Sequence, residues 1–254
     1  KRRIVRKKGC DLKSPFLILA HYHIYDICLV GNMLSTFSYT RSEATINKKL
    51  ISMLYPVCRL TTPIETGSGV FISNTLILTV FHSLKDAITS LGLPNGVQEI
   101  RHPITCEVFP FGKVEQFSAD IYAYDEAQDI ALLKLKSGSY EHFAQLIALT
   151  QINALNIFDD LYTVGASLGH EPIPTKGILT YKKEELGFGK YWMTDAHILL
   201  GNSGGGVFIT LDNKYYLIGL TTSLMVDEEN NQTHITHFIP PDSIHNFLNS
   251  LNLD

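Results

Sequence analysis

The chain has 254 residues, of which 45% are hydrophobic and 18% are charged, and its formal net charge is −4 at pH 7. This composition excludes an intrinsically disordered chain and provides for a substantial core in one or two compact units. The charge is uneven, because residues 1–13 are strongly basic and the rest of the chain is therefore acidic. An acidic body excludes a typical nucleic-acid-binding domain, in which basic residues spread over one folded face.

Residues 1–50 are predicted to be a basic N-terminal extension with an apolar segment. The apolar part, Phe16–Leu34, is interrupted by His21, His23 and Asp26. A basic stretch followed by an apolar one is typical of signal peptides and membrane anchors, but an aspartate is costly in a spanning helix. Two alternatives follow: a membrane contact, or a helix or strand packed on the body. Residues 41–50 are polar and predict a linker or the start of a short helix. An exported and a cytoplasmic location both stay open.

The cysteines are widely spaced and include no Cys-x-x-Cys pair; they are Cys10, Cys28, Cys58 and Cys106. This spacing indicates neither a metal site nor a dense disulfide framework, so free thiols are expected.

Short apolar runs separated by Gly, Pro, Asn and Asp recur from residue 51 onward. They are Val57–Leu60, Gly69–Ile72, Leu76–Val80, Ile104–Phe109, Ile121–Tyr124, Ile130–Leu135, Leu161–Val164, Gly177–Tyr181, Tyr191–Thr194, Val207–Thr210, Tyr215–Thr221 and Thr236–Ile239. Runs of this length predict an all-β barrel or sandwich. A less regular stretch near 140–158 divides them into two β halves, which we place at residues 51–145 and 146–254.

Helical spacing is predicted in two places only. One is the stretch after His82, and the other is the C-terminal segment from Pro241, where Ile244, Phe247, Leu248 and Leu251 fall on one helical face. Either Asp242 or Ser243 is expected to cap this second helix.

Three stretches carry candidate chemistry. Ser203 lies in Gly201–Gly205, where glycines allow the sharp turn that exposes a nucleophile and aims backbone N–H groups at one point. His82 ends an apolar strand, and Asp129 precedes another. An aspartate can orient an imidazole, which then takes the serine proton. The order His, Asp, Ser therefore predicts a catalytic triad for acyl transfer.

The same pentapeptide also matches the G-x-S-x-G nucleophile elbow of α/β-hydrolases. That fold requires a helix directly after the serine and the order Ser, acid, His. Here three glycines and the strand-like Val207–Thr210 follow Ser203. Only Asp227 with His234 or His237 could complete such a triad, which leaves too few residues for the missing βα units. This alternative is rejected.

The chain resembles trypsin-like serine peptidases of the chymotrypsin fold, and among them the HtrA/Deg type. The matching stretches are Gly67–Ile72, Leu78–His82, Asp129–Lys134, Val164–Gly169, Gly177–Leu179, Thr194–Gly205, Leu217–Thr222 and Phe238–Pro240. The resemblance covers roughly residues 55–250 and implies two six-stranded antiparallel β-barrels with the active site between them. It makes His82 the general base, Asp129 its orienting acid and Ser203 the nucleophile. The N–H groups of Gly201 and Ser203 would form the oxyanion hole, and Thr222 would line the cleft.

The resemblance also locates a substrate pocket, whose expected residues are His197, Ile198, Leu200, Thr222, Ser223, Leu224 and His237. His197 falls where this fold has the pocket base, and the Deg type usually has a small residue there. One hypothesis is that His197 recognises a polar or acidic side chain. The alternative, which we favour because Leu224 would narrow the site, is a buried neutral His197 bonded to His237 or backbone, with a pocket for small aliphatic residues. Leu199-Leu200 replaces the usual Asn-Pro of the loop.

We therefore predict a serine endopeptidase that acts on protein or peptide substrates, without a cofactor or metal and without nucleic acid. Deg-type enzymes usually carry PDZ domains after the protease and often trimerise through N-terminal segments. No PDZ domain is recognisable here, and residues 14–45 are a candidate trimerisation segment. Two alternatives stay open: a catalytically latent fold used as a binding or scaffold module, and a viral or effector type of enzyme that cuts one defined target.

Overall fold

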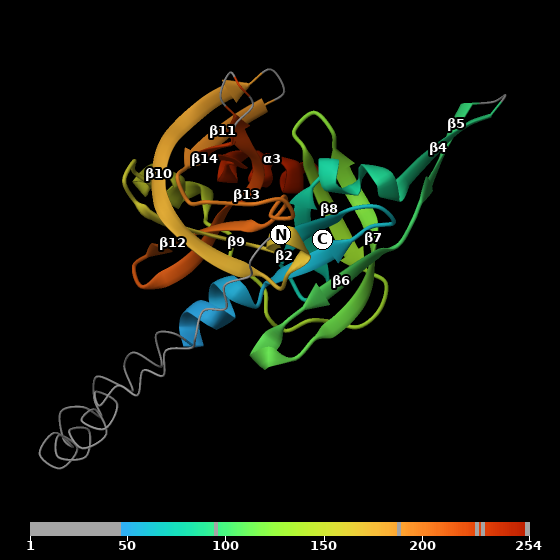
Figure 1. The fold of residues 1–254 in the computed structure, drawn as a ribbon, viewed down its shortest axis with the longest axis horizontal. Coiled ribbons are helices and arrows are strands. Elements are labelled where there is room, and N and C mark those ends of the chain that lie inside the picture. Colours follow the sequence, from blue (N-terminus) through green and yellow to red (C-terminus); the bar gives the residue numbers. More distant parts are fainter. Residues whose placement is uncertain (1–46, 94–95, 187–188, 227–228, 230–231, 252–254) are drawn as a thin grey trace, which may run out of the picture. The chain divides into compact units, whose positions relative to one another are not determined.

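The computed structural model describes residues 47–93, 96–186, 189–226, 229 and 232–251 (Figure 1). Lys48–Asp254 is one compact unit. The expectations for the basic head, the apolar segment, its membrane contact and a trimer fall on residues 1–46, outside the described part. Within the described ranges, helices are all too short or too polar to cross a bilayer.

Two closed antiparallel barrels of six strands each form the body. The first, in the order β1-β2-β3-β8-β7-β6, consists of β1 (Val57–Thr61), β2 (Thr66–Phe71), β3 (Leu76–Val80), β6 (Ile104–Val108), β7 (Glu115–Asp125) and β8 (Ile130–Leu135). The second, in the order β10-β11-β14-β13-β12-β9, consists of β9 (Asp160–Gly165), β10 (Ile173–Leu186), β11 (Gly189–Thr194), β12 (Gly206–Leu211), β13 (Lys214–Val226) and β14 (Gln232–Ile239). The predicted double-barrel fold is confirmed.

Short helices connect and flank the barrels. They are the π-helical turn η1 (Leu50–Leu54), the 3₁₀ turns η2 (His82–Ala87), η3 (Pro110–Gly112), η4 (Leu149–Ala154) and η5 (Ser167–Gly169), and the C-terminal helix α3 (Pro241–Ser250). The expected cap of α3 is wrong. Pro240 is the N-cap residue and no side chain caps the helix. Pro241 occupies the first helical position, which suits proline because its missing N–H would lack a partner there in any case.

The apolar runs of the central strands are continuous because both of their faces are buried. In β3, Ile77 packs inside the first barrel with Phe71, whereas Leu78 belongs to a cluster shared with Phe208 and Leu217 of the second barrel. β8 behaves in the same way, with successive residues in alternating clusters. A strand exposed on one face would instead alternate apolar and polar residues. The shared cluster joins the two barrels.

The hairpin of β4 (Ile88–Leu93) and β5 (Gly96–Arg101) was not predicted. It is a separate two-stranded sheet that extends away from the first barrel (Figure 1). Its residues 98–101 are exposed, so burial imposes no alternating pattern on them.

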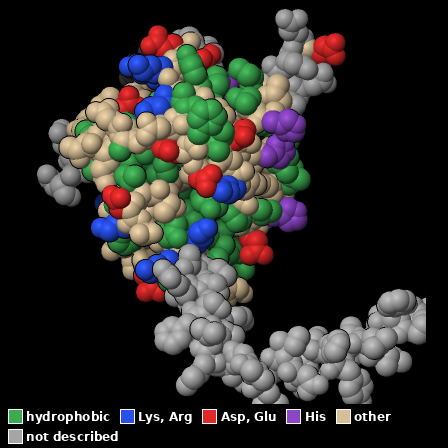
Figure 2. All heavy atoms as spheres, turned by 90° about the vertical axis from the view of Figure 1, so that its left-hand side faces the viewer, with side chains coloured by type: hydrophobic (Ala, Val, Ile, Leu, Met, Phe, Trp, Pro, Cys, Tyr) green, Lys and Arg blue, Asp and Glu red, His purple; other side chains and the backbone are tan. Residues whose placement is uncertain are grey.

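On the face shown in Figure 2, acidic and basic side chains are interspersed rather than gathered by sign.

Candidate active site

His82 is placed by the end of β3. The strand is paired with β8 so that Val80 lies opposite Ile130, which brings the residues after Val80 beside Asp129. The backbone N–H of Phe81 donates to the Asp129 carbonyl (3.1 Å). The N–H of His82 donates to Asp129 Oδ1 (2.8 Å), and His82 Nδ1 lies 2.7 Å from Asp129 Oδ2. One carboxylate therefore holds both the backbone and the ring of His82.

Asp129 occupies the turn between β7 and β8 and has a positive φ of 55°. Non-glycine residues adopt this left-handed conformation rarely, and aspartate is among those that tolerate it best. The turn is stabilised by Asp125, whose carboxylate accepts from the backbone N–H of Gln128 (3.0 Å). Such backbone outliers are common at functional sites. Here the turn directs the carboxylate at His82.

Thr222 connects the second barrel to this pair. Its hydroxyl donates to Asp129 Oδ2 (3.0 Å), and its carbonyl accepts from the hydroxyl of Ser203 (3.2 Å). Since Asp129 binds Nδ1 of His82, the ring carries its proton there and leaves Nε2 as an acceptor. Within the described residues, Nε2 has no hydrogen-bond partner. The structure thus gathers His82, Asp129 and Ser203 into one site.

The N–H of Gly201 is aimed by the carbonyl of the same peptide bond. The Leu200 carbonyl accepts from the N–H of Leu168 (2.6 Å), and in a planar trans peptide the N–H points the opposite way. Gly201 has a φ of +92°, and a Cβ there would collide with the Ala166 carbonyl, so only glycine fits. Among the described residues, no acceptor faces the Gly201 N–H.

The N–H of Ser203 is aimed in the same manner. The carbonyl of Asn202 accepts from the Thr221 hydroxyl (2.5 Å) and from the N–H of Gly205 (2.8 Å). The Asn202 side chain is buried and accepts from the Ser167 hydroxyl (2.6 Å). In the described part of the chain, the Ser203 N–H also lacks an acceptor. Two unpaired N–H groups thus accompany the Ser203 hydroxyl, and this is the composition of an oxyanion hole.

The expected pocket residues are divided between the surface and the interior. Leu200 is exposed over 73% of its surface, Ile198 is buried, and Ser223 is exposed next to the partly buried Leu224. His197 is exposed, and its ring lies 5.9 Å from that of His234. The burial of His197, which the favoured alternative expected together with a bond to His237 or backbone, is therefore wrong, because this side chain is exposed. The preference for small aliphatic residues stays a prediction.

The buried histidine of this region is His237. It is only 5% exposed, lies 3.4 Å from the Ser223 hydroxyl through Nδ1, and packs edge-on to Tyr191 (6.1 Å between ring centroids). Burial lowers the pKa of His237, and the Glu184 carboxylate opposes part of this shift. Burial likewise raises the pKa of Tyr191, with Asp129 as a smaller cause. His237 is therefore neutral at neutral pH.

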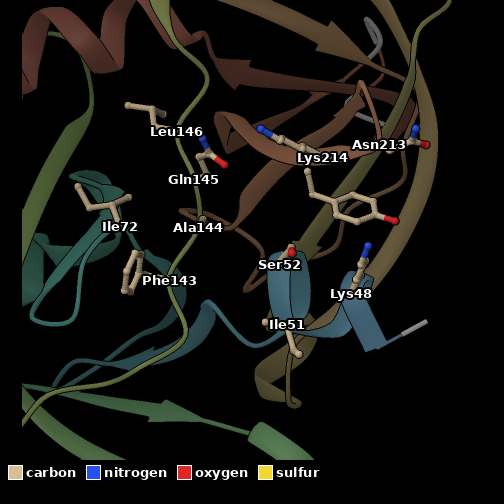
Figure 3. Close-up of a pocket in the computed structure, with 11 residues that line it drawn as sticks. Lys48, Ile51, Ser52, Ile72, Phe143, Ala144, Gln145, Leu146, Asn213 and Lys214 are labelled. Atoms are coloured by element: carbon tan, nitrogen blue, oxygen red, sulfur yellow. The ribbon is translucent and has the colours of Figure 1, made fainter. Parts of the chain in front are cut away.

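A cavity of about 740 Å³ lies elsewhere, between η1, residues 143–146 and the turn that joins β12 to β13 (Figure 3). Figure 3 shows Lys48, Ser52 and Lys214 around it, and none of the expected catalytic residues lines it.

No cluster of three or more His, Cys, Asp or Glu side chains in the described ranges could hold a metal ion. Cys58 and Cys106 are free and buried, and burial raises the pKa of the Cys106 thiol.

Sequence reasoning missed the buried residues that fix the serine loop, Gly201–Gly205, in place. These are Ser68, Ser167, Asn202 and Thr221, all of which are buried. Ser68 belongs to a matching motif, but no pattern indicates that its hydroxyl bonds a carbonyl 133 positions away. Such contacts are set by the packing of the two barrels.

The chain is similar to known proteins in sequence and in fold. The model of the trypsin-like peptidase domain matches residues 67–220, more than half of the chain. Serine protease Do-like HtrA of Lactococcus lactis subsp. lactis (strain IL1403) is 28% identical over 154 residues, which are 55% of this chain and 36% of that protein. The protein of the same name from Lactococcus lactis subsp. cremoris (strain MG1363) is 27% identical over the same shares. The chain thus spans about a third of the length of these relatives.

Solved structures share the fold. The HtrA-type protease AlgW with a tripeptide has a TM-score of 0.63 at 21% identity, over 81% of this chain and 62% of that chain. The MamO protease domain from Magnetospirillum magneticum, in its apo form, has a TM-score of 0.57 at 16% identity, over 77% and 97%. The match to the family model shows that the chain belongs to the trypsin-like peptidases, and the curated relatives show that it is HtrA-like.

Proposed function

We propose that the chain is a serine endopeptidase that hydrolyses peptide bonds through an acyl-enzyme on Ser203. His82 is the general base, Asp129 holds it in the Nδ1–H tautomer, and the N–H groups of Gly201 and Ser203 stabilise the oxyanion. One observation carries this proposal. Asp129 bonds both the backbone N–H and the ring Nδ1 of His82, and Ser203 lies beside them with the unpaired N–H groups of Gly201 and Ser203.

The chemistry proceeds in two halves. Ser203 Oγ attacks the peptide carbonyl while its proton passes to His82 Nε2, and the carbonyl oxygen takes the negative charge. The intermediate collapses, and the leaving amine receives the proton from His82. Water then attacks the ester with His82 as base, which releases the carboxylic acid and restores Ser203. Asp129 stays ionised throughout and stabilises the imidazolium.

One observation favours the alternative of a latent fold used for binding. The Ser203 hydroxyl donates to the Thr222 carbonyl and not to His82, so the serine must rotate before it can transfer its proton. Catalytic hydrogen bonds are often long or misaligned without substrate. A rotation about one side-chain bond is a small change, and the backbone of the loop already has the required form. We therefore place the active enzyme first.

Labelling with a fluorophosphonate probe separates the two functions. Attack by Ser203 Oγ on phosphorus expels fluoride and leaves a stable phosphonyl-serine. Wild type should be labelled, and Ser203→Ala should not. His82→Ala should be labelled more slowly by several orders of magnitude. Equal labelling of wild type and Ser203→Ala, or no labelling of folded wild type, would reject an active triad and support the latent fold.

Protein or peptide substrates follow from the proposed reaction. Denatured casein distinguishes broad degradation, in which casein is cut at many positions, from narrow processing of one target, in which casein stays intact while the probe still labels Ser203. A trimer and a membrane contact concern residues outside the described ranges and stay predictions, as do the absence of a cofactor and the absence of a nucleic-acid partner.

A further inference from the structure

Ser68 is a fully buried serine in β2 that uses all of its polar groups. Its hydroxyl donates to the Gly201 carbonyl (2.6 Å) and accepts from the N–H of Ala166 (2.8 Å). Its backbone N–H donates to the Ser203 carbonyl (2.8 Å), and its own carbonyl accepts from the Thr79 hydroxyl (2.7 Å). A residue of the first barrel thus binds two carbonyls of the serine loop of the second barrel, those of Gly201 and Ser203, which lie on either side of Asn202.

These two bonds complete the fixation of the loop. The second barrel holds the carbonyls of Leu200 and Asn202, as described above, whereas Ser68 holds those of Gly201 and Ser203. Gly201 is the flexible point, because its φ of +92° lies in a region where glycine moves freely. The Gly201 N–H belongs to the peptide before this point, whose carbonyl is held by Leu168. The hydroxyl of Ser68 holds the peptide after it, so the peptides on both sides of Gly201 are fixed and the glycine has little freedom to rotate.

The donor on Ala166 gives the hydroxyl its direction. Because the Ala166 N–H occupies a lone pair of Ser68 Oγ, the proton of that oxygen is free to face the Gly201 carbonyl. Ala166 directly precedes Ser167 and Leu168, which bond to Asn202 and Leu200. The two supports of the loop are therefore joined to each other through Ser68.

Ser68 is also connected to the histidine side of the site. Thr79, which bonds the Ser68 carbonyl, is buried in β3, the strand that leads to His82. A displacement of the serine loop relative to β3 would strain these bonds of Ser68. Ser68 thus connects the loop that contains Ser203 with β3, the strand that ends just before His82.

We propose that Ser68 is a positioning residue that holds the N–H of Gly201 in place to receive the oxyanion, acting across the barrel interface. This inference rests on the proposed function. Ser68 touches no reacting atom; it acts through the Gly201 carbonyl and the Ala166 N–H. Substrate binding outside the oxyanion hole should therefore be independent of it.

The test is the concentration dependence of fluorophosphonate inactivation, which separates the maximal rate kinact from the half-saturating concentration KI. Removing a donor from an oxyanion hole costs about 10²- to 10³-fold in rate. Ser68→Ala displaces such a donor without removing it, so kinact should fall by about 10- to 100-fold while KI stays the same. Ser68→Cys keeps a weaker donor and acceptor at the same place, and its kinact should lie between the two.

Ser73→Ala is the matched control. Ser73 lies in the same barrel, and its hydroxyl accepts from the N–H groups of Thr75 and Leu76, so its loss lowers stability at a distance from the serine loop. The Tm should fall in both alanine variants, but kinact should fall only in Ser68→Ala. If Ser68→Ala does not fold, Ser68→Cys alone decides, through its kinact.

The outcomes separate the inference from the function on which it rests. Unlabelled wild type would overturn the proposed endopeptidase itself. Labelled wild type with an unchanged kinact in folded Ser68→Ala or Ser68→Cys would overturn only the role of Ser68. A rise in KI at constant kinact would also overturn it, because Ser68 would then act on binding.

Discussion

The hydroxyl of Thr222 donates a 3.0 Å hydrogen bond to Oδ2 of Asp129, the same oxygen that lies 2.7 Å from Nδ1 of His82. The carboxylate of the first barrel is thereby oriented by a strand of the second. Since the carbonyl of the same threonine accepts from the Ser203 hydroxyl, Thr222 contacts both Asp129 and Ser203. The first contact is made by its side chain and the second by its backbone, so a substitution can remove the first and keep the second.

Thr222→Val should slow fluorophosphonate labelling by about tenfold, because a hydrogen bond to a charged group contributes about 1.5–3 kcal/mol and His82 still has both of its bonds to Asp129. Valine has the shape of threonine without the donor, so the fold should persist. Thr210→Val, at an exposed position of β12, should label at the wild-type rate. Equal rates for the two variants would show that the Thr222 hydroxyl is dispensable.

Asp129→Asn should lower the labelling rate by about 10⁴-fold at neutral pH. An amide can donate to Nδ1 and thereby stabilise the wrong tautomer of His82, whose Nε2 then carries a proton and cannot accept one from Ser203. Circular dichroism should show an unchanged fold. A rate within tenfold of wild type would mean that His82 does not act as the base.

Gly204→Ala should unfold the chain or abolish labelling. Gly204 has a φ of +83°, and a Cβ there would collide with Ser68 O and Thr79 Oγ1, which are held by each other. Gly112→Ala is the matched control, since its φ is +71° but nothing lies within 4 Å of the added Cβ. It should cost only the left-handed backbone penalty of about 1–2 kcal/mol. Thermal unfolding of both variants measures the difference, and similar losses would exclude the predicted collision.

The sequence predicted the barrel strands best where burial leaves little choice. β3 and β8 were predicted at their observed ends, Leu76–Val80 and Ile130–Leu135, because strands buried on both faces read as uninterrupted apolar runs. β4 and β5 were missed because exposed strands need no such pattern. The ends of β10 and β13 were underestimated, since both strands continue beyond their predicted apolar runs through pairing with the neighbouring strands β11 and β14.

At the site, sequence order and local glycines sufficed to name His82, Asp129 and Ser203. They were insufficient for the supports of the loop, because Ser68 and Ser167 act through contacts between segments far apart in the chain. The pocket illustrates the same limit. His197 and His237 are equally plausible pocket histidines in the sequence, and only the path of the loop shows that the first is exposed and the second buried.

His237 predicts a pH dependence of stability. Burial lowers its pKa in the folded chain below the ordinary value of 6.5, so the unfolded chain takes up a proton first as pH falls. The stability that neutral His237 contributes is complete above pH 6.5 and is lost as pH falls through the lowered folded pKa, below which the loss levels off. Glu184 opposes the shift and so reduces the size of the loss.

The measurement is the free energy of unfolding by urea between pH 8 and pH 4.5 for wild type, His237→Gln and His102→Gln. His237→Gln should be less stable than wild type at pH 8, and its deficit should shrink as the pH falls, because glutamine has no proton to take up. His102, which is exposed, serves as the control, and its variant should follow wild type over the whole range. A deficit of His237→Gln that stays constant with pH would mean that the folded chain protonates His237 as readily as the unfolded chain does, and that burial does not keep this ring neutral.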